Sequence, residues 1–218
     1  MVAQSPDRDG SALLVVDVQP DFLPGGRLAV PGGNQILDGV RHLMLSDAFQ
    51  VVVATQDWHP PGHASFASSH PGKEPFDTIP LHGHEQVLWP EHCIQGTPGA
   101  LLAPELPWDR AHLILRKGMD PRVDSYSGFR NNWGPDGTRP DTGLAGYLEG
   151  RGIRRVTICG LARDVCVRWT AEDAVDAGFD TTLVWDLSRS VDPSADDDLR
   201  SALSHHGVHL VPLDELED

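Results

Sequence analysis

The stretch RRVTICGLARDVCVRWTAEDA, residues 154–174, changes character at its central glycine. Before Gly160 it has the β-branched and apolar residues of a buried strand, and after a short turn its apolar residues recur at helical spacing from about 165 to 177. A strand that leads through a short turn into a helix is the repeating unit of parallel α/β folds. The stretch therefore predicts a parallel sheet with helices packed against it.

The same alternation recurs along the rest of the chain. Strands are predicted at 12–18, 50–57, 112–118, 154–160, 181–186 and 208–213. Helices are predicted within 34–48, at 142–150, at about 165–177 and within 194–206. The pattern indicates an α/β fold, with an open, mainly parallel β-sheet of about six strands and helices on both faces. The order of the strands in the sheet cannot be read from the sequence.

Length and composition favour one folded domain over residues 1–218, with residues 1–10 as a flexible end. The hydrophobic share of 39% and the charged share of 22% are ordinary for a folded α/β chain. A formal net charge of −15 repels phosphate backbones and anionic lipid surfaces, so neither nucleic acid nor membrane is expected as a partner. A homo-oligomer is left open.

The lack of a recognisable targeting signal and the cysteine usage predict a cytoplasmic protein. The longest apolar runs are far shorter than a bilayer span, and no basic segment followed by an apolar core opens the chain. The three cysteines, at 93, 159 and 166, cannot all pair with one another, which favours a reducing compartment.

Two long polar segments interrupt the strand and helix pattern. Residues 58–110 are rich in proline and histidine, and residues 119–140 are rich in Asp, Asn, Gly and Ser. Long connections in a compact domain are usually functional, so both segments are expected to contribute to a site.

Titratable residues follow the predicted strands at their carboxyl ends. The first strand is followed by Asp17, the second by Asp57, the third by Lys117, the fourth by a turn that leads to Cys166, and the fifth by Asp186. A strand often ends in a charged residue simply because it ends at solvent. In open parallel sheets, however, ligands bind beyond these ends, and the succession of such residues predicts a site there.

Cys166 is a candidate nucleophile. It lies outside the apolar stripe of its predicted helix, and Asp164 as the N-cap residue would place it in the first turn, where free N–H groups and the helix dipole favour a thiolate. The alternative is a buried cysteine that packs as a small apolar residue. That alternative suits Cys159, inside the preceding strand, better than Cys166.

A complete set for acyl transfer can be assembled around this thiol. Asp17 can accept the thiol proton, Lys117 can stabilise the anion, and the amides around Ala162 and Cys166 can donate to a developing oxyanion. The sequence alone does not show that these groups meet.

A second cluster has the residue types of a metal site. Asp57 and His59 stand two residues apart at a strand end, and a later loop adds His92. Carboxylate and imidazole ligands without cysteine pairs suit an open divalent transition-metal site. His63 lies between two interpretations, a ligand and a solvated loop histidine.

Five stretches carry a resemblance to a known family. They are VVDVQPDFLPGGRLAV (15–30), ATQDWHPPGHASF (54–66), WPEHCIQGTPGA (89–100), RKGMDPRVDSYSGF (116–129) and GLARDVCVRWTAEDA (160–174). In this order they resemble the bacterial nicotinamidases and pyrazinamidases of the isochorismatase-like (cysteine hydrolase) superfamily. The resemblance extends from about residue 12 to residue 190 and implies the three-layer α/β/α fold of that superfamily.

The resemblance implies a role for each candidate. Asp17, Lys117 and Cys166 match the family's catalytic triad of proton acceptor, thiolate partner and nucleophile. The family's metal ligands correspond to Asp57, His59 and His92, and in some members to His63 as a fourth. The implied cofactor is one divalent metal ion, with zinc favoured over iron or manganese. It would bind the ring nitrogen of a pyridine substrate.

The resemblance also implies features of the binding pocket. It places a non-proline cis peptide between Leu161 and Ala162, with the amides of Ala162 and Cys166 as the oxyanion hole. It makes Phe22 and Trp89 the aromatic residues that flank the substrate ring, although each could be ordinary core packing.

The implied activity is hydrolysis of nicotinamide to nicotinate and ammonia through a cysteine thioester, in NAD salvage, with pyrazinamide as a second substrate. Three positions depart from the family pattern: Arg163 and Val165 replace what is often Thr and an aromatic residue or His, and Pro20 replaces a frequent Asn. The departures beside the nucleophile bear on substrate preference, and Arg163 has no explanation from the sequence.

Three alternatives remain open at this point. A different small amide or carbamoyl compound could be the substrate, although relatives that act on such compounds generally lack the metal trio. The chain could be an inactive binding protein, which the presence of Asp17, Lys117 and Cys166 disfavours. It could also be a redox-sensing thiol protein, which would need a resolving cysteine beside Cys166.

Overall fold

The computed structural model describes residues 9–216, and residues 1–8 of the predicted flexible end lie outside this range. A six-stranded sheet organises the fold, in the order β5-β2-β1-β6-β7-β8, and all of its strands are parallel. The strands are β1 (Ser11–Val16), β2 (Val51–Asp57), β5 (Leu113–Lys117), β6 (Arg155–Leu161), β7 (Asp180–Arg189) and β8 (His209–Val211).

The centre of the sheet is buried on both faces. β1 pairs with β2 and with β6, so that Ala12 lies beside Val51 on one side and Val156 on the other. Every residue of β1 is buried. This explains why β1 and β2 are nearly continuous apolar runs with no polar face.

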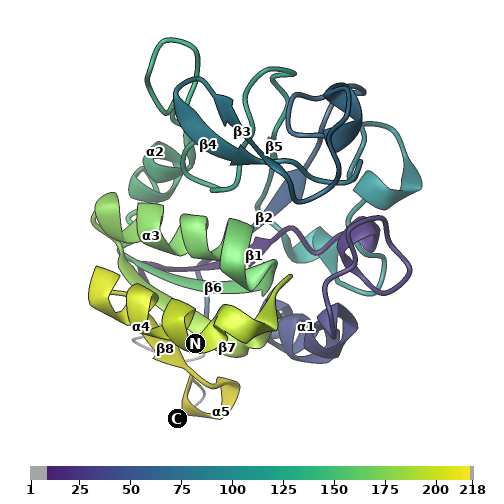
Figure 1. Cartoon of the computed structure of the whole chain (residues 1–218). Helices are drawn as coiled ribbons and strands as arrows, with labels where there is room; N and C mark the ends of the chain where they lie inside the picture. Colours follow the sequence, from purple (N-terminus) through teal and green to yellow (C-terminus); the bar gives the residue numbers. More distant parts are fainter. Residues whose placement is uncertain (1–8, 217–218) are drawn as a thin grey trace, which may run out of the picture.

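Helices cover the two faces, as Figure 1 shows. On one face α1 (Leu37–Leu45) and α5 (Leu213–Leu216) pack with Leu13 and Val15 of β1. On the other face, the alternate β1 residues Ala12 and Leu14 pack with α2, α3 and α4. Those helices are α2 (Leu144–Glu149), α3 (Arg168–Asp176) and α4 (Asp196–His206). The predicted parallel sheet with helices on both faces is therefore confirmed.

Within residues 9–216, no helix combines the length and the apolar character that crossing a lipid bilayer requires.

The strand β7 is longer than its sequence pattern predicts. It continues to Arg189, and its register against β6 shifts between Ile158 and Gly160. Asp186 consequently lies within the strand rather than at its end, is exposed, and accepts a hydrogen bond from the Leu213 amide at 2.9 Å. The expectation that Asp186 joins the other strand-end residues in a site is wrong.

The proline- and histidine-rich segment contains a hairpin that the sequence pattern did not predict. Its strands are β3 (Thr78–Leu81) and β4 (His84–Val87), which pair only with each other. His82 and Gly83 connect them, both with positive φ, as a tight two-residue hairpin turn requires. The strands are four residues long and mostly exposed, so they lack the apolar alternation by which strands are recognised.

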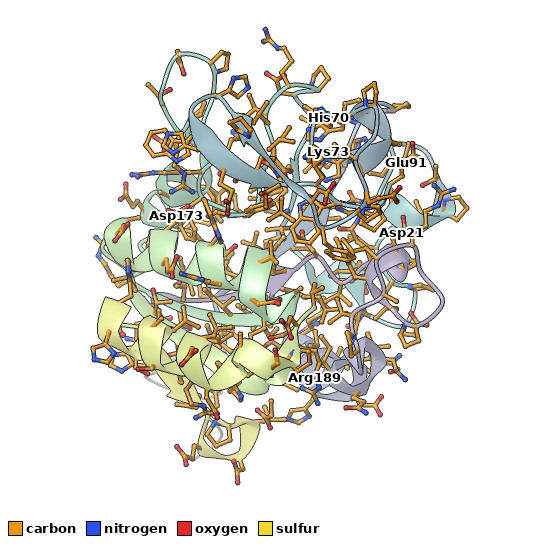
Figure 2. All side chains as sticks on the ribbon, viewed as in Figure 1. Asp21, His70, Lys73, Glu91, Asp173 and Arg189 are labelled. Atoms are coloured by element: carbon orange, nitrogen blue, oxygen red, sulfur yellow. The ribbon has the colours of Figure 1, made fainter. Side chains whose placement is uncertain are left out.

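The second long segment is fixed to the helix layer. Arg139 donates two hydrogen bonds to the carboxylate of Asp173 on α3, at 2.8 and 2.7 Å, and its guanidinium lies over the Trp169 ring. Figure 2 labels Asp173 on the side of α3 that faces this segment. The segment is thus held over the carboxyl ends of the strands, where polar side chains converge.

Candidate active site

The carboxyl ends of four neighbouring strands, β5, β2, β1 and β6, bring the candidate residues together. Lys117 ends β5, Asp57 ends β2, and Asp17 follows β1 directly. Lys117 and Asp57 are register partners, and Cys166 lies five residues beyond the end of β6. Because neighbouring parallel strands end at one edge, four groups that are distant in sequence meet here.

Lys117 lies at the centre of this group and is buried. Its Nζ is 2.8 Å from Asp17 Oδ2 and 2.7 Å from Asp57 Oδ1, and it donates to the Ser125 carbonyl oxygen at 2.8 Å. Burial alone would lower the pKa of Lys117, but the charges of Asp17 and Asp57 outweigh it and raise the pKa well above its usual value. The cluster therefore contains a permanent cation.

Asp17 has one oxygen that is held and one that is not. Its Oδ1 accepts a hydrogen bond from Thr55 Oγ1 at 2.6 Å, whereas Oδ2 faces Lys117 but accepts no hydrogen bond of normal geometry within the described residues. Burial raises the pKa of Asp17, and Lys117 offsets that only partly. A carboxylate with a raised pKa and an unsatisfied oxygen is suited to accept a proton.

The thiol of Cys166 lies against this cluster. Lys117 Nζ donates to Sγ at 3.5 Å, and a carboxylate oxygen from each of Asp17 and Asp57 lies within 4.8 Å of it. Burial raises the pKa of Cys166 well above its usual value, the charge of Lys117 opposes this, and the two carboxylates add to it. Burial and the two carboxylates thus favour the thiol form, so Cys166 needs Lys117 and a proton acceptor to ionise.

The helix terminus itself differs from the sequence prediction. Ala162 occupies the N-cap position, and the turn from Arg163 to Val167 is a π-helix that precedes α3. Asp164 does not cap this turn, because its carboxylate accepts hydrogen bonds from the amides of Val191 and Asp192. The prediction of Asp164 as N-cap is therefore wrong.

The π turn leaves the Cys166 amide outside the usual helical hydrogen bonding. The Ala162 carbonyl accepts the N–H groups of Val165 at 3.1 Å and Val167 at 3.0 Å, and the intervening Cys166 amide is not among its donors. The peptide bond between Leu161 and Ala162 is cis, as the resemblance implied. Ala162 and Cys166, whose amides the resemblance implies as the oxyanion hole, both line the pocket beside the thiol.

Asp57, His59 and His92 form a buried group whose potential ligand atoms lie within 4.8 Å of one another. The Nε2 atoms of His59 and His92 are 3.3 and 3.4 Å from Asp57 Oδ2. Nδ1 of His59 lies 3.1 Å from the Gly118 carbonyl oxygen, and Nδ1 of His92 lies 2.8 Å from that of Pro90. Since a carbonyl can only accept, each Nδ1 carries a proton, and each Nε2 faces Asp57, where its lone pair would be available to a metal ion.

The negative charge of Asp57 favours a positive charge beside it, which either a proton on His59 or a metal ion can supply. Burial would raise the pKa of Asp57, but Lys117 and His59 outweigh it and hold the pKa well below its usual value. Burial would lower the pKa of His59, but Asp57 outweighs it and raises the pKa. One ionised carboxylate and two oriented imidazole nitrogens fit a divalent transition metal with open coordination positions.

His63 is differently engaged. Its Nδ1 accepts the Ser65 amide N–H at 3.2 Å, so the proton lies on Nε2, which faces the carbonyl oxygens of Asp120 at 2.9 Å and Val123 at 3.3 Å. Ligand atoms of His63, His59 and Asp124 do lie within 4.8 Å of one another. With both ring nitrogens occupied, His63 supports the loop that follows Lys117, and the arrangement favours three protein ligands.

A pocket opens in front of the thiol. The predicted aromatic residues Phe22 and Trp89 line it together with Cys166, Ala162 and Asp57. Both aromatic side chains are also part of the apolar core, so they pack and line the pocket at once. The wall combines aromatic surface with a few polar groups, as the walls of small-molecule sites commonly do.

Comparison with known proteins identifies the family. The isochorismatase domain matches residues 11–215. The chain belongs to the isochorismatase family. The resemblance inferred from the sequence motifs is thereby confirmed.

Several relatives within the isochorismatase family are similar over most of this chain. A nicotinamidase of Acinetobacter baylyi is 50% identical over 181 residues, which cover 83% of this chain and 82% of the relative. A solved structure of an Acinetobacter baumanii nicotinamidase and pyrazinamidase superposes with a TM-score of 0.89 and 45% identity, covering 95% of this chain and 98% of the other.

Two further solved structures contain bound groups. A protein of L. infantum in complex with nicotinate has a TM-score of 0.81 and 40% identity, covering 97% of this chain and 96% of the other. The pyrazinamidase of Pyrococcus horikoshii in complex with zinc has a TM-score of 0.74 and 35% identity, covering 93% of this chain and 99% of the other.

Three residues of this isochorismatase-family site were not singled out from the sequence. Thr55 holds Asp17, and strand alternation could have indicated it, because it lies two residues before Asp57 and so on the same face of β2. Asp124 and Tyr126 line the pocket from the polar segment after β5. That segment has no periodicity, so no pattern could distinguish them from solvated loop residues.

Proposed function

We propose that this chain is a nicotinamidase, which hydrolyses the carboxamide of nicotinamide to nicotinate and ammonia. The observation that carries the proposal is the meeting of Cys166, Lys117 and Asp17 at the wall of an aromatic-lined pocket, beside Asp57 and its two histidines. A pyridine carboxamide presents a flat ring to such a wall and an amide carbon to the thiol. The relatives named as nicotinamidases support this substrate.

The first half of the reaction forms a thioester. The carboxylate of Asp17 accepts the Cys166 proton through Oδ2, the oxygen that accepts no hydrogen bond at rest, and Sγ attacks the amide carbon. The amides of Ala162 and Cys166 donate to the negative oxygen of the tetrahedral intermediate. When the carbon–nitrogen bond breaks, Asp17 returns its proton to the departing nitrogen, which leaves as ammonia.

The second half releases the acid. A water molecule gives a proton to Asp17 and attacks the thioester carbon, and the same amides hold the oxyanion. The carbon–sulfur bond then breaks, nicotinate leaves, and the proton on Asp17 returns to Cys166. The chain ends in its starting state, and one water has been consumed for each amide hydrolysed.

Lys117 provides the charge that makes thiol ionisation attainable. In the resting state two carboxylates face one ammonium group, and ionising Cys166 adds a second excess negative charge to a buried cluster. Lys117 Nζ is 3.5 Å from Sγ and can shift its donation toward the thiolate as Asp17 becomes neutral. The transfer of a proton to Asp17 thus keeps the total charge of the cluster constant.

We further propose zinc as the resident metal, held by Asp57 Oδ2 and by Nε2 of His59 and His92. The zinc-bound relative supports this choice, and the donor set fits it. When bound there, a divalent cation supplies a Lewis acid for the lone pair of the pyridine nitrogen. The protein's own part is to fix the donors: hydrogen bonds from the histidine Nδ1 atoms to main-chain carbonyls hold the two imidazoles, and Lys117 holds Asp57.

The remaining expectations belong to this proposal. The chain works as one domain in the cytoplasm, in NAD salvage, without nucleic acid or membrane as a partner, and a homo-oligomer is compatible with it. The match over residues 11–215 supports one domain. Pyrazinamide, a diazine carboxamide of nearly the same shape, is expected as a second substrate.

The test is ammonia release from a panel of carboxamides by the metal-loaded protein. Nicotinamide and pyrazinamide are expected to be hydrolysed, benzamide, which lacks the ring nitrogen, much more slowly, and a chelator is expected to abolish turnover. Cys166→Ala is expected to lose at least about 10⁴-fold in kcat while keeping its metal, since no nucleophile remains. Turnover of nicotinamide by that variant at the parent rate would rule out the thioester route.

A further inference from the structure

Arg163 stands three residues before the nucleophile, and its guanidinium is almost completely buried, with 4% of the residue exposed. Nε donates to Ser188 Oγ at 2.9 Å, one terminal nitrogen to Asp196 Oδ2 at 2.6 Å, and the other to the carbonyl oxygens of Trp185 and Ser188. These acceptors belong to β7 and to the start of α4. One side chain therefore joins the turn of Cys166 to the end of β7.

Besides its hydrogen bonds, the guanidinium of Arg163 stacks on an aromatic ring. Its central carbon lies 4.0 Å from the centre of the Trp185 ring, and Arg200 of α4 stacks on the same ring at 4.4 Å. Among the described residues, Arg200 makes no hydrogen bond to the turn or to the end of β7. The two arginines thus share an aromatic partner, but only Arg163 connects the two segments.

The neighbouring Asp164 makes a parallel connection. Its two carboxylate oxygens accept the amides of Val191 and Asp192, each at 2.9 Å. Asp196, the charge partner of Arg163, also accepts a hydrogen bond from Ser190. Residues 188–192, which follow from the end of β7 near Arg189 in Figure 2, are therefore tied to the nucleophile turn at several points.

These ties reach the substrate pocket. Val191 lines it together with Ala162, Val165 and Cys166, which all belong to the turn. The separation between Val191 and the turn sets the width of this part of the pocket. Strand pairing holds Leu161 beside Arg189, and beyond that pairing the side chains of Arg163 and Asp164 connect the two segments. Neither touches the reacting atoms.

We propose that Arg163 is a positioning residue that sets the width of the pocket between the nucleophile turn and Val191, and so selects against ring-substituted carboxamides. The proposal rests on the proposed function for its substrates. A guanidinium is required because it donates in three directions within one plane that stacks on Trp185. A lysine ammonium can reach only part of the same acceptors.

The experiment compares Arg163→Lys and Arg163→Met with Arg200→Met, which removes the other cation from the same tryptophan ring. Each variant is assayed with nicotinamide and with 5-methylnicotinamide. For both Arg163 variants we expect kcat/KM for nicotinamide to fall about 10-fold or more, because small displacements near a reacting group are costly. The ratio of kcat/KM for the methylated to the plain substrate should rise at least about 5-fold, because a wider pocket accepts the methyl group. A general loss of stability would lower both values together and leave this ratio unchanged.

A second readout does not depend on turnover. Hydrogen exchange of the peptide that covers residues 188–192 is expected to accelerate at least about 10-fold in the Arg163 variants and to stay at the parent rate in Arg200→Met. If the parent protein fails to hydrolyse nicotinamide, the proposed function fails while this readout still tests the connection. If Arg163→Met does not fold, Arg163→Lys carries both measurements.

Two results would overturn the proposal. One is an unchanged selectivity ratio and unchanged exchange in Arg163→Lys, which would make the connection unimportant for the pocket. The other is an equal effect of Arg200→Met, which would assign the effect to packing around Trp185 rather than to the hydrogen bonds of Arg163.

Discussion

Lys117 and Arg163 are both buried cations beside the turn of Cys166, yet their surroundings differ. Lys117 faces two carboxylates and a thiol, and one of those carboxylate oxygens accepts no hydrogen bond. Arg163 meets one carboxylate, a hydroxyl and two carbonyl oxygens, and it stacks on Trp185. The cluster around Lys117 consists of groups that can exchange protons, whereas the hydrogen bonds of Arg163 to main-chain and side-chain oxygens hold the shape of the pocket.

The largest effect is expected from Lys117→Met. The substitution leaves Asp17 and Asp57 buried side by side without a cation, so kcat should fall at least about 10⁴-fold and the free energy of unfolding by about 3–5 kcal/mol. Urea denaturation and ammonia release measure the two effects. The matched control is Arg116→Met, an exposed cation one residue earlier on β5, which should change kcat less than 3-fold.

The same variant makes a prediction about pH. In the parent, burial already raises the pKa of Asp17, and Lys117 lowers it in part. Without Lys117 the folded-state pKa rises further above the unfolded value, so the folded state holds its proton more tightly. The stability deficit of metal-free Lys117→Met should therefore be smallest at acid pH and grow as the pH rises. A deficit that shrinks toward alkaline pH would contradict this account of the cluster.

A difference of roughly 10³-fold in alkylation rate is expected between Cys166 and Cys159 in the folded protein. Both thiols are buried, but Cys166 lines the pocket and has Asp17 beside it as a proton acceptor, whereas burial alone raises the pKa of Cys159 to about 12. Iodoacetamide labelling followed by mass spectrometry separates the sites. Equal labelling of both cysteines at low reagent would show that accessibility to the pocket and a neighbouring base do not decide thiol reactivity here.

His59→Ala is expected to weaken metal affinity more than about 100-fold, because it removes one of three oriented donors. His63→Ala is the matched comparison from the same loop and should weaken affinity less than about 10-fold, since both of its ring nitrogens are engaged by the protein. Metal titration with competing chelators measures both. Similar losses in the two variants would make His63 a ligand and would revise the three-donor site.

The smallest effect is expected from Asp196→Asn. The substitution keeps the shape of the group that Arg163 Nη1 meets but removes its charge, and this carboxylate is partly exposed. A charge-assisted hydrogen bond becomes a neutral one, so kcat/KM should fall only about 3-fold. A loss as large as that of Lys117→Met would remove the distinction between the two cations.

The strand-end residues were predictable because they depend on a general rule. Asp17, Asp57 and Lys117 each stand at the carboxyl end of a strand that the sequence pattern predicts, and adjacent parallel strands end at one edge. Asp186 fits the same local pattern, but the prediction that it lies at a strand end was wrong, because β7 continues for three residues past it through a shift in register. A run of apolar residues indicates that a strand exists more reliably than it indicates where the strand ends.

The turn before Cys166 shows where local rules fail. Asp164 has the residue type and position of a helix cap, but its carboxylate binds amides 27 and 28 residues later in the chain. Those amides come from the segment after β7, whose place beside the turn is set by the sheet. A side chain that can satisfy either a local or a distant donor cannot be assigned from the sequence around it.

The sequence by itself determined the alternation of strands and helices, the class of the fold, and the chemical types of the groups that can act: a thiol, a lysine, carboxylates and two histidines. These follow from local periodicity and from residue chemistry. Only the tertiary structure decided which groups meet, that burial raises the pKa of Cys166, that His63 is engaged by the loop, and that Arg163 joins the nucleophile turn to the end of β7. Those outcomes depend on distances between segments far apart in the chain, and on burial that raises or lowers pKa values, neither of which a local pattern contains.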